Sequence, residues 1–170
     1  MKSFFLCSLM LGLLLCLTPS GNAATNTDHA AVALSKLQAL IGEWQGKLPD
    51  GNDIRISYEQ INGGAILERY RSTDPIWWNM STMYHQDNQT LIMSHYCSWG
   101  NHPRMSAVID SPVTKTIDFQ FIDLSHNEPD NGYMRDFDIE FIDVDQVIHY
   151  WHWREDGKDT PLTLKLKRVK

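Results

Sequence analysis

Residues 136–141 have the sequence Asp-Phe-Asp-Ile-Glu-Phe, a strict alternation of charged and apolar side chains. Because successive side chains of a strand point to opposite faces, this period of two predicts a half-buried β-strand. Similar alternation recurs at residues 54–59, 118–121 and 162–167. The pattern therefore predicts an all-β fold.

Turn signals separate these segments, with Asp, Asn, Gly or Pro clustered at 49–52, 62–64, 87–88, 130–132 and 156–157. They divide the chain into about ten short strands joined mostly by hairpins, which favours an up-and-down antiparallel meander. An open meander of this length exposes two edges, and closure removes both. We therefore predict an up-and-down antiparallel β-barrel of about ten strands.

A helical pattern precedes the first predicted strand. Between residues 30 and 41 the apolar side chains follow the spacing of one helical face, at Val32, Leu34, Leu37, Leu40 and Ile41. This spacing predicts a short N-terminal helix, and we expect it to lie against the barrel as a lid or plug.

The chain begins with the order of a secretory signal peptide, over residues 1–24. Lys2 gives a positive start, residues 4–17 are almost wholly apolar, and small residues follow as far as Ala23 and Ala24. The apolar run is shorter than the about 20 residues that a membrane span needs. We therefore predict cleavage after Ala23 or Ala24 and a periplasmic or secreted protein.

The mature domain, residues 25–170, is acidic and keeps one cysteine. The formal net charge of the full chain is −6 at pH 7, and it becomes −7 when Lys2 leaves with the signal. Nucleic acids need a basic face and anionic membranes a basic amphipathic stretch, so both are disfavoured as partners. Cys7 and Cys16 also leave with the signal, which gives Cys97 no partner for an internal disulfide.

The central segment 80–97 predicts a hairpin with one apolar face. We take Asp87 and Asn88 as its turn, which puts Tyr84 opposite Leu91. A turn one residue longer would exchange the two faces. We place the more apolar face inside the barrel; it carries Met80, Thr82, Tyr84, Leu91, Met93, His95 and Cys97.

The polar side chains of this inner face form the candidate site. His95 is a core histidine bonded to Tyr84 or a backbone carbonyl, or a contact to a bound ligand, or a single metal ligand. Cys97 is either a small core residue or a catalytic thiolate, since His95 lies two positions away on the same face. Thr82 and Tyr84 place hydroxyl groups in the same lumen.

The loop 100–104 supplies two further candidates at the rim of the barrel. Gly100 and Pro103 fix its path, and Asn101 is expected to brace the backbone. Arg104 either caps an anionic ligand group with its guanidinium or pairs with an Asp of a neighbouring strand. Both alternatives stay open at this point.

Aromatic rings occupy both faces of segment 149–153, so the lumen there is aromatic whichever parity points inward. Trp151 is the candidate that we take from this segment. His149 and His152 have opposite parity, so one straight strand cannot bring both to one metal ion. Trp77 and Trp78 lie in a loop and suit either a portal for an apolar ligand or a folded-back plug.

Two features resemble the lipocalin/calycin superfamily. The first is Gly42-Glu43-Trp44, a Gly-x-Trp at the start of the first predicted strand, and the second is Arg168 at the close of the last. Arg168 shares the parity of the apolar residues of its strand. The resemblance implies that its guanidinium packs over Trp44 in a cation–π contact that closes one end of the barrel.

The middle of the chain resembles an uncharacterised exported bacterial calycin-like family. That family carries a Tyr-His-x-Asp turn followed by His-Tyr-Cys-x-x-Gly-Asn-x-Pro-Arg-Met, as at 84–87 and 95–105 of this chain. The resemblance implies a fold and no established activity. A likeness to nitrobindin, another branch with about ten strands, implies haem held by a histidine near the last strands, yet residues 161–170 contain no histidine.

Three functions stay open. The leading one is an exported binding protein that holds a small, mostly apolar ligand with a polar or anionic end. Its predicted ligand-binding residues are Thr82, Tyr84, His95, Cys97, Asn101, Arg104 and Trp151. The second is an enzyme that uses His95 as general acid or base, with Tyr84 orienting the substrate. The third is a haem or metal binder through His95, His149 or His152; no cofactor is otherwise expected.

Overall fold

The computed structural model describes residues 28–72, 78–107, 109, 115–126 and 132–170. The predicted signal peptide and Trp77 lie outside these residues. The elements in chain order are α1 (His29–Gln38), β1 (Gly42–Lys47), β2 (Asp53–Gln60), η1 (Asn62–Gly64), β3 (Ile66–Arg71), β4 (Ser81–Asp87), β5 (Thr90–Tyr96), β6 (His102–Ala107), β7 (Thr116–Ser125), β8 (Tyr133–Asp143), β9 (Gln146–Glu155) and β10 (Lys158–Arg168).

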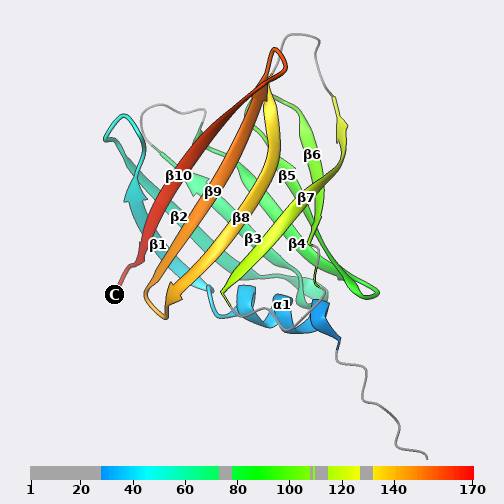
Figure 1. The fold of residues 1–170 in the computed structure, drawn as a ribbon. Coiled ribbons are helices and arrows are strands. Elements are labelled where there is room, and N and C mark those ends of the chain that lie inside the picture. The colour runs from blue at the N-terminus through cyan, green and yellow to red at the C-terminus, as the bar shows by residue number, and fades with distance from the viewer. Residues whose placement is uncertain (1–27, 73–77, 108, 110–114, 127–131) are drawn as a thin grey trace, which may run out of the picture.

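The ten strands form one closed antiparallel barrel, which confirms the predicted fold (Figure 1). Each strand pairs with its neighbours in chain order, and β1 pairs with β10 to close the ring. Closure leaves no free edge, as the alternation pattern required. The inward side chains of all ten strands contribute to a single hydrophobic core.

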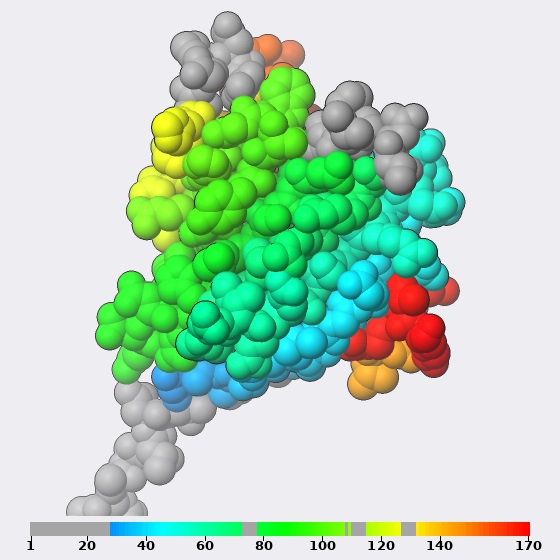
Figure 2. Space-filling model, turned by 180° about the vertical axis from the view of Figure 1, so that it is seen from behind, coloured from blue at the N-terminus to red at the C-terminus, as the bar shows by residue number. Residues whose placement is uncertain are grey.

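Helix α1 lies across one end of the barrel, which we call the helix end (Figure 1). The Asp28 side chain caps the helix by accepting a hydrogen bond from the backbone N–H of Ala31 at 3.0 Å. Ala30, Ala33 and Leu37 are fully buried. Seen from behind, the middle strands form a continuous wall with α1 along its lower edge (Figure 2). The predicted N-terminal helix is confirmed as an end cover.

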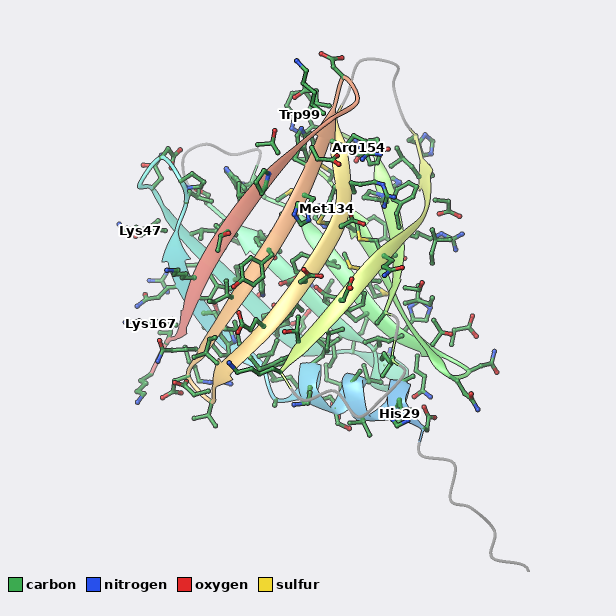
Figure 3. All side chains as sticks on the ribbon, viewed as in Figure 1. His29, Lys47, Trp99, Met134, Arg154 and Lys167 are labelled. Atoms are coloured by element: carbon green, nitrogen blue, oxygen red, sulfur yellow. The ribbon has the colours of Figure 1, made fainter. Side chains whose placement is uncertain are left out.

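The opposite end, which we call the loop end, carries the β1–β2, β5–β6 and β9–β10 turns (Figure 1). Figure 3 places Trp99 and Arg154 there and His29 at the helix end.

Trp44 and Arg168 close the helix end together. The Arg168 guanidinium carbon lies 4.3 Å from the centroid of the Trp44 ring, as the calycin resemblance implied. The indole N–H of Trp44 donates to the carbonyl of Leu40 at 2.7 Å. Arg168 also donates to the carbonyls of Ala39 and Ile41. The Arg168 side chain on β10 therefore contacts both Trp44 on β1 and the backbone of the segment after α1, and so connects these three parts at the helix end.

The register of the β4–β5 hairpin differs from the prediction. Asp87 pairs with Thr90, so Asn88 and Gln89 form the turn, and Tyr84 lies opposite Met93 rather than Leu91. Asn88 adopts a left-handed φ of 53°, which asparagine tolerates better than most residues. The shift moves the pairing by an even number of residues and leaves the faces unchanged. The predicted inner face is therefore confirmed: Met80, Thr82, Tyr84, Leu91, Met93, His95 and Cys97 are all buried.

Gly46 lies where β1 meets β10, and we expect a side chain there to weaken the closure. A Cβ at Gly46 would lie 2.7 Å from the carbonyl oxygen of Lys165 and 2.8 Å from the Leu166 side chain. Gly46→Ala should lower the free energy of unfolding by about 1–3 kcal/mol, measured by urea denaturation. Gln45→Ala, on the outward face of the same strand, is the control and should cost less. An unchanged Gly46→Ala variant would show that β10 can move aside.

Candidate functional site

Four inward polar side chains follow one another across neighbouring strands. Tyr58 on β2 pairs with Glu68 on β3, and Thr82 on β4 pairs with both Glu68 and His95 on β5. Directly opposite residues of an antiparallel pair have side chains within contact distance. All four are buried, with at most 2% of each residue exposed. We call Tyr58, Glu68, Thr82 and His95 the polar row.

Glu68 is a fully buried carboxylate held by phenol groups. The hydroxyl of Tyr58 donates to its Oε1 at 2.5 Å, and the hydroxyl of Tyr84 donates to its Oε2 at 2.7 Å. Burial raises the pKa of Glu68 to about 7, and hydrogen bonds from the surrounding hydroxyls act in the opposite direction. No lysine or arginine among the described residues is buried.

His149 reaches the polar row from β9. Its Nε2 lies 2.8 Å from the Tyr58 hydroxyl and its Nδ1 lies 2.8 Å from the Tyr70 hydroxyl. Burial lowers the pKa of His149 to about 3, so the imidazole is neutral near pH 7, with one nitrogen donating and the other accepting. Glu68, Tyr58, His149 and Tyr70 therefore form one continuous hydrogen-bonded chain.

His95 has one engaged nitrogen and one without a partner. Its Nδ1 lies 2.8 Å from the Thr82 hydroxyl, whereas its buried Nε2 has no hydrogen-bond partner among the described residues. Burial lowers the pKa of His95 to about 3, so this ring is also neutral. The predicted partners, Tyr84 or a backbone carbonyl, are wrong, because the observed register puts Thr82 directly opposite His95.

Trp151 contacts His95 inside the lumen. The two ring centroids are 5.4 Å apart at 88°. The buried Nε1 of Trp151 also makes no hydrogen bond of normal distance and angle with the described residues, although the Tyr70 ring lies edge-on at 5.1 Å and its interaction with Trp151 acts against the burial that raises the pKa of Tyr70. Trp78, at the loop end, packs against Trp151 with 6.0 Å between centroids. Buried polar atoms are normally satisfied, so these two nitrogens are exceptions within the described part of the core.

The remaining predicted site residues lie apart from this pair. Asn101 is buried and braces the backbone, since its Nδ2 donates to the Gly132 carbonyl at 2.8 Å. Arg104 points outward and binds Asp123 on β7 with two hydrogen bonds, which is the second of its two predicted alternatives. Cys97 is in the core, where burial raises the pKa of its thiol and disfavours a thiolate.

Glu68, Tyr58 and Tyr70 were missed in the sequence, although a signal was present. In the segment 66–71, Glu68 has the parity of Ile66 and Tyr70, the residues that point inward. A carboxylate at an inward position of a strand is unusual because burial of an unpaired charge is costly. That position alone identifies Glu68 as a candidate. The contact with His149 has no local sequence signal.

Three histidines, His95, His149 and His152, were the predicted candidates for holding haem or a metal ion. Both nitrogens of His149 are engaged, and His152 is partly exposed on the outer wall. Nε2 of His95 has no hydrogen-bond partner among the described residues, and the Trp151 ring lies edge-on to the imidazole. Among the described residues, no three His, Cys, Asp or Glu side chains are grouped to hold a metal ion.

Two hollows lie on the outer wall, and neither is lined by the polar row. One is lined by Gln45, Gly46, Lys47, Asp53, Thr163, Lys165 and Lys167. The other is lined by Asp118, Gln120, Phe121, Arg135, Asp136, Asp138 and His152. No helix in the described part of the chain has the length and apolar character to cross a membrane.

Comparisons with known proteins add little to this geometry. No protein-family model matches the chain. No curated protein matches it. Among the solved structures that match is EF1p2_mFAP2b bound to DFHBI, which is 18% identical, with 84% of this chain and 98% of that chain covered at a TM-score of 0.35. A likeness this weak carries no argument about function. The closed ten-strand barrel and its short helix themselves fit a calycin-like architecture.

Proposed function

We propose that this is an exported binding protein that holds a small, mostly apolar ligand in the barrel lumen, with a polar group of the ligand at His95 and Trp151. The observation that carries the proposal is the buried Nε2 of His95, which has no hydrogen-bond partner among the described residues; beside it, Nε1 of Trp151 makes no hydrogen bond of normal geometry with them. An unsatisfied buried polar atom costs about 1–3 kcal/mol. A ligand group that accepts from the indole and donates to the imidazole recovers that cost.

The surroundings of Trp151 support an apolar ligand body. Its ring contacts those of Tyr70, Phe137 and Trp78 at centroid distances of 5.1, 5.6 and 6.0 Å. Aromatic walls with a few polar groups are typical of small-molecule sites. Because α1 and the Trp44–Arg168 contact close the helix end, the ligand would arrive from the loop end, past Trp78.

The charged residues near the interior favour a ligand whose polar end is uncharged over one whose polar end is anionic. Arg104 lies on the outer wall with Asp123, and none of the described arginines is buried, so the described interior offers no guanidinium to an anionic group. Among the described residues, the buried residue with a charged type of side chain is Glu68, which is an acid. The enzyme alternative gains no support, since an imidazole with a pKa of about 3 is a weak general base near pH 7.

Decan-1-ol is expected to displace Nile red from the protein, and Trp151→Phe should weaken its binding about tenfold. The variant keeps an aromatic ring but loses the indole N–H, and one buried hydrogen bond is worth about 1–1.5 kcal/mol. His95→Phe should act in the same direction. His85→Phe, on the outer face of β4, is the control and should leave the affinity unchanged. Absence of displacement in the wild-type protein would refute a binding lumen.

Export follows from the predicted signal peptide and is part of the proposal. The mature protein should begin at Ala24 or Thr25. N-terminal sequencing of protein recovered outside the cytoplasm of producing cells tests this directly. A mature protein that keeps Met1 would contradict it.

A further inference from the structure

A basic wall covers the outside of four neighbouring strands, β10, β1, β2 and β3. Its cations occupy the positions that alternate with the buried residues of each strand, so their side chains point outward. In Figure 3, Lys47 and Lys167 lie on the same side of the barrel and point away from it. The cations of the basic wall are Lys47, Arg55, Arg69, Arg71, Lys165 and Lys167.

The strand register aligns several of these cations in one row. Arg71 on β3 lies directly opposite Arg55 on β2. On the other side of Arg55, Gln45 on β1 separates it from Lys167 on β10. Directly opposite side chains of one face have Cβ atoms about 5 Å apart, and like charges at that separation repel each other. An anion bound along the row relieves this repulsion.

A hollow of about 550 Å³ extends the row between β10 and β1. Lys47, Lys165 and Lys167 line it, and the amide of Gln45 and the hydroxyl of Thr163 add hydrogen-bond donors. The outer wall therefore offers a recess in which several donors and cations meet.

Most cations of the basic wall have no acid to pair with. Three of its four acids bind cations already, in the pairs Asp53–Lys47, Glu59–Arg69 and Asp159–Arg154, and the fourth is Glu43. The ion pairs of the described residues involve none of four cations: Arg55, Arg71, Lys165 and Lys167. The basic wall thus keeps an excess of positive charge.

The acidic net charge of the chain does not describe this wall, because acids gather on another one. Asp118 on β7 lies directly opposite Asp138 on β8, and Asp136 and Glu140 follow on the same face of β8. Acids and cations therefore occupy different walls of the barrel. An anionic partner is repelled by β7 and β8 and attracted to the basic wall.

The shape of the basic wall and the types of residue on it favour a flexible phosphate chain. The row crosses four of the ten strands of a closed ring, so it follows a curve that a flat bilayer does not match. Among the described outward residues of these strands there is no aromatic ring on which the bases of a nucleic acid would stack. Arginine binds phosphate with paired hydrogen bonds. We infer that the basic wall binds a flexible chain of phosphate groups without bases.

Long-chain inorganic polyphosphate tests this inference in the wild-type protein, and the test is independent of the ligand proposed for the lumen. Fluorescence anisotropy at low ionic strength should show saturable binding that weakens as salt is added, because exposed charges are screened. Tripolyphosphate spans only part of the row and should bind more weakly. Polyglutamate, single-stranded DNA and phosphatidylglycerol vesicles should each bind about tenfold or more weakly than polyphosphate.

Arg55→Gln/Arg71→Gln should weaken polyphosphate binding about tenfold or more, since each cation near an anionic partner contributes about a factor of five. Lys165→Gln/Lys167→Gln should act in the same way. The matched control is Arg104→Gln/Arg154→Gln, which removes the same charge from β6 and β9 and should leave the affinity unchanged. Because Arg55 and Arg71 repel each other, their replacement should not lower the free energy of unfolding.

A loss of affinity in both wall variants, with the control unchanged, supports the inference. The inference is overturned if wild-type protein does not bind polyphosphate at low ionic strength, or if the control loses as much affinity as the wall variants. It is overturned equally if polyglutamate, single-stranded DNA or the vesicles bind as tightly as polyphosphate.

Discussion

Replacing Trp44 by alanine is expected to lower the free energy of unfolding by about 4 kcal/mol, the range found for buried tryptophans. The Trp44 side chain is fully buried. Its loss also leaves the Leu40 carbonyl without the indole N–H and removes the ring beneath the Arg168 guanidinium. Three contributions thus disappear at once from the seal of the helix end. Urea denaturation followed by far-ultraviolet circular dichroism measures the change.

The control for Trp44→Ala is Trp99→Ala. Trp99 is half exposed at the loop end, so removing the same side chain there should cost about 1 kcal/mol or less. A loss for Trp44→Ala as small as this would mean that the Trp44–Arg168 contact does not hold the barrel closed. Arg168→Met, which keeps an apolar stem over the ring, should give an intermediate value.

Acidification is expected to destabilise the protein, because two histidines are buried in the neutral state. Burial lowers the pKa of His95 and of His149 to about 3, from an ordinary value of 6.5. Near pH 5 the unfolded chain therefore binds protons that the folded chain does not. The contribution of the two neutral histidines to the stability of the fold is fully present above about pH 6.5 and is lost as the pH falls toward 3. Between pH 7 and 5 the two histidines together lower the free energy of unfolding by about 4 kcal/mol.

Glu68 opposes this loss. Burial raises its pKa to about 7 from an ordinary value of 4.5, so between these limits the folded chain binds a proton that the unfolded chain does not. This contribution is present below about pH 4.5 and is lost as the pH rises through 7. When the pH falls from 7 to 5, the protonation of Glu68 raises the free energy of unfolding by about 2 kcal/mol. The net loss from the three groups should be about 2 kcal/mol.

The variant Glu68→Gln isolates the carboxylate, because all other titrating groups stay in place. Its free energy of unfolding should fall about 2 kcal/mol further than that of the wild-type protein between pH 7 and 5. Urea denaturation at several pH values measures both slopes, and Glu43→Gln should follow the wild-type curve. Parallel curves for Glu68→Gln and the wild-type protein would mean that Glu68 titrates as in water.

The barrel could be predicted from the sequence because its signals are local. The alternation at 136–141 fixes which side chains are buried, and parity alone placed Thr82, Tyr84 and His95 inward even though the turn at Asn88 was assigned one position too early. Parity tolerates such an error, since a shift by an even number of residues keeps every side chain on its face. The same shift does change the residue opposite His95, from the predicted Met80 to Thr82.

The candidate site could be predicted only in part. Thr82, Tyr84 and His95 were predicted to face the interior and do so, whereas Arg104 pairs with Asp123 on the outer wall. The direction of Trp151 was left open, and the structure places it inside. Alternation distinguishes the two faces of a strand, but it does not identify which oppositely charged neighbour a rim arginine will find. Glu68 was visible as an acid at an inward position and was missed beside the apolar residues of its strand.

The sequence by itself determined an all-β barrel, a helix at its start and the inward face of the strands that alternate clearly, because burial parity there depends only on neighbouring residues. It left the inward face of 149–153 open. The tertiary structure decided which polar atoms meet. His149 on β9 bonds with Tyr58 on β2 and Tyr70 on β3 across the lumen. That contact depends on the tilt and stagger of ten strands in a closed ring, which are properties of the whole barrel.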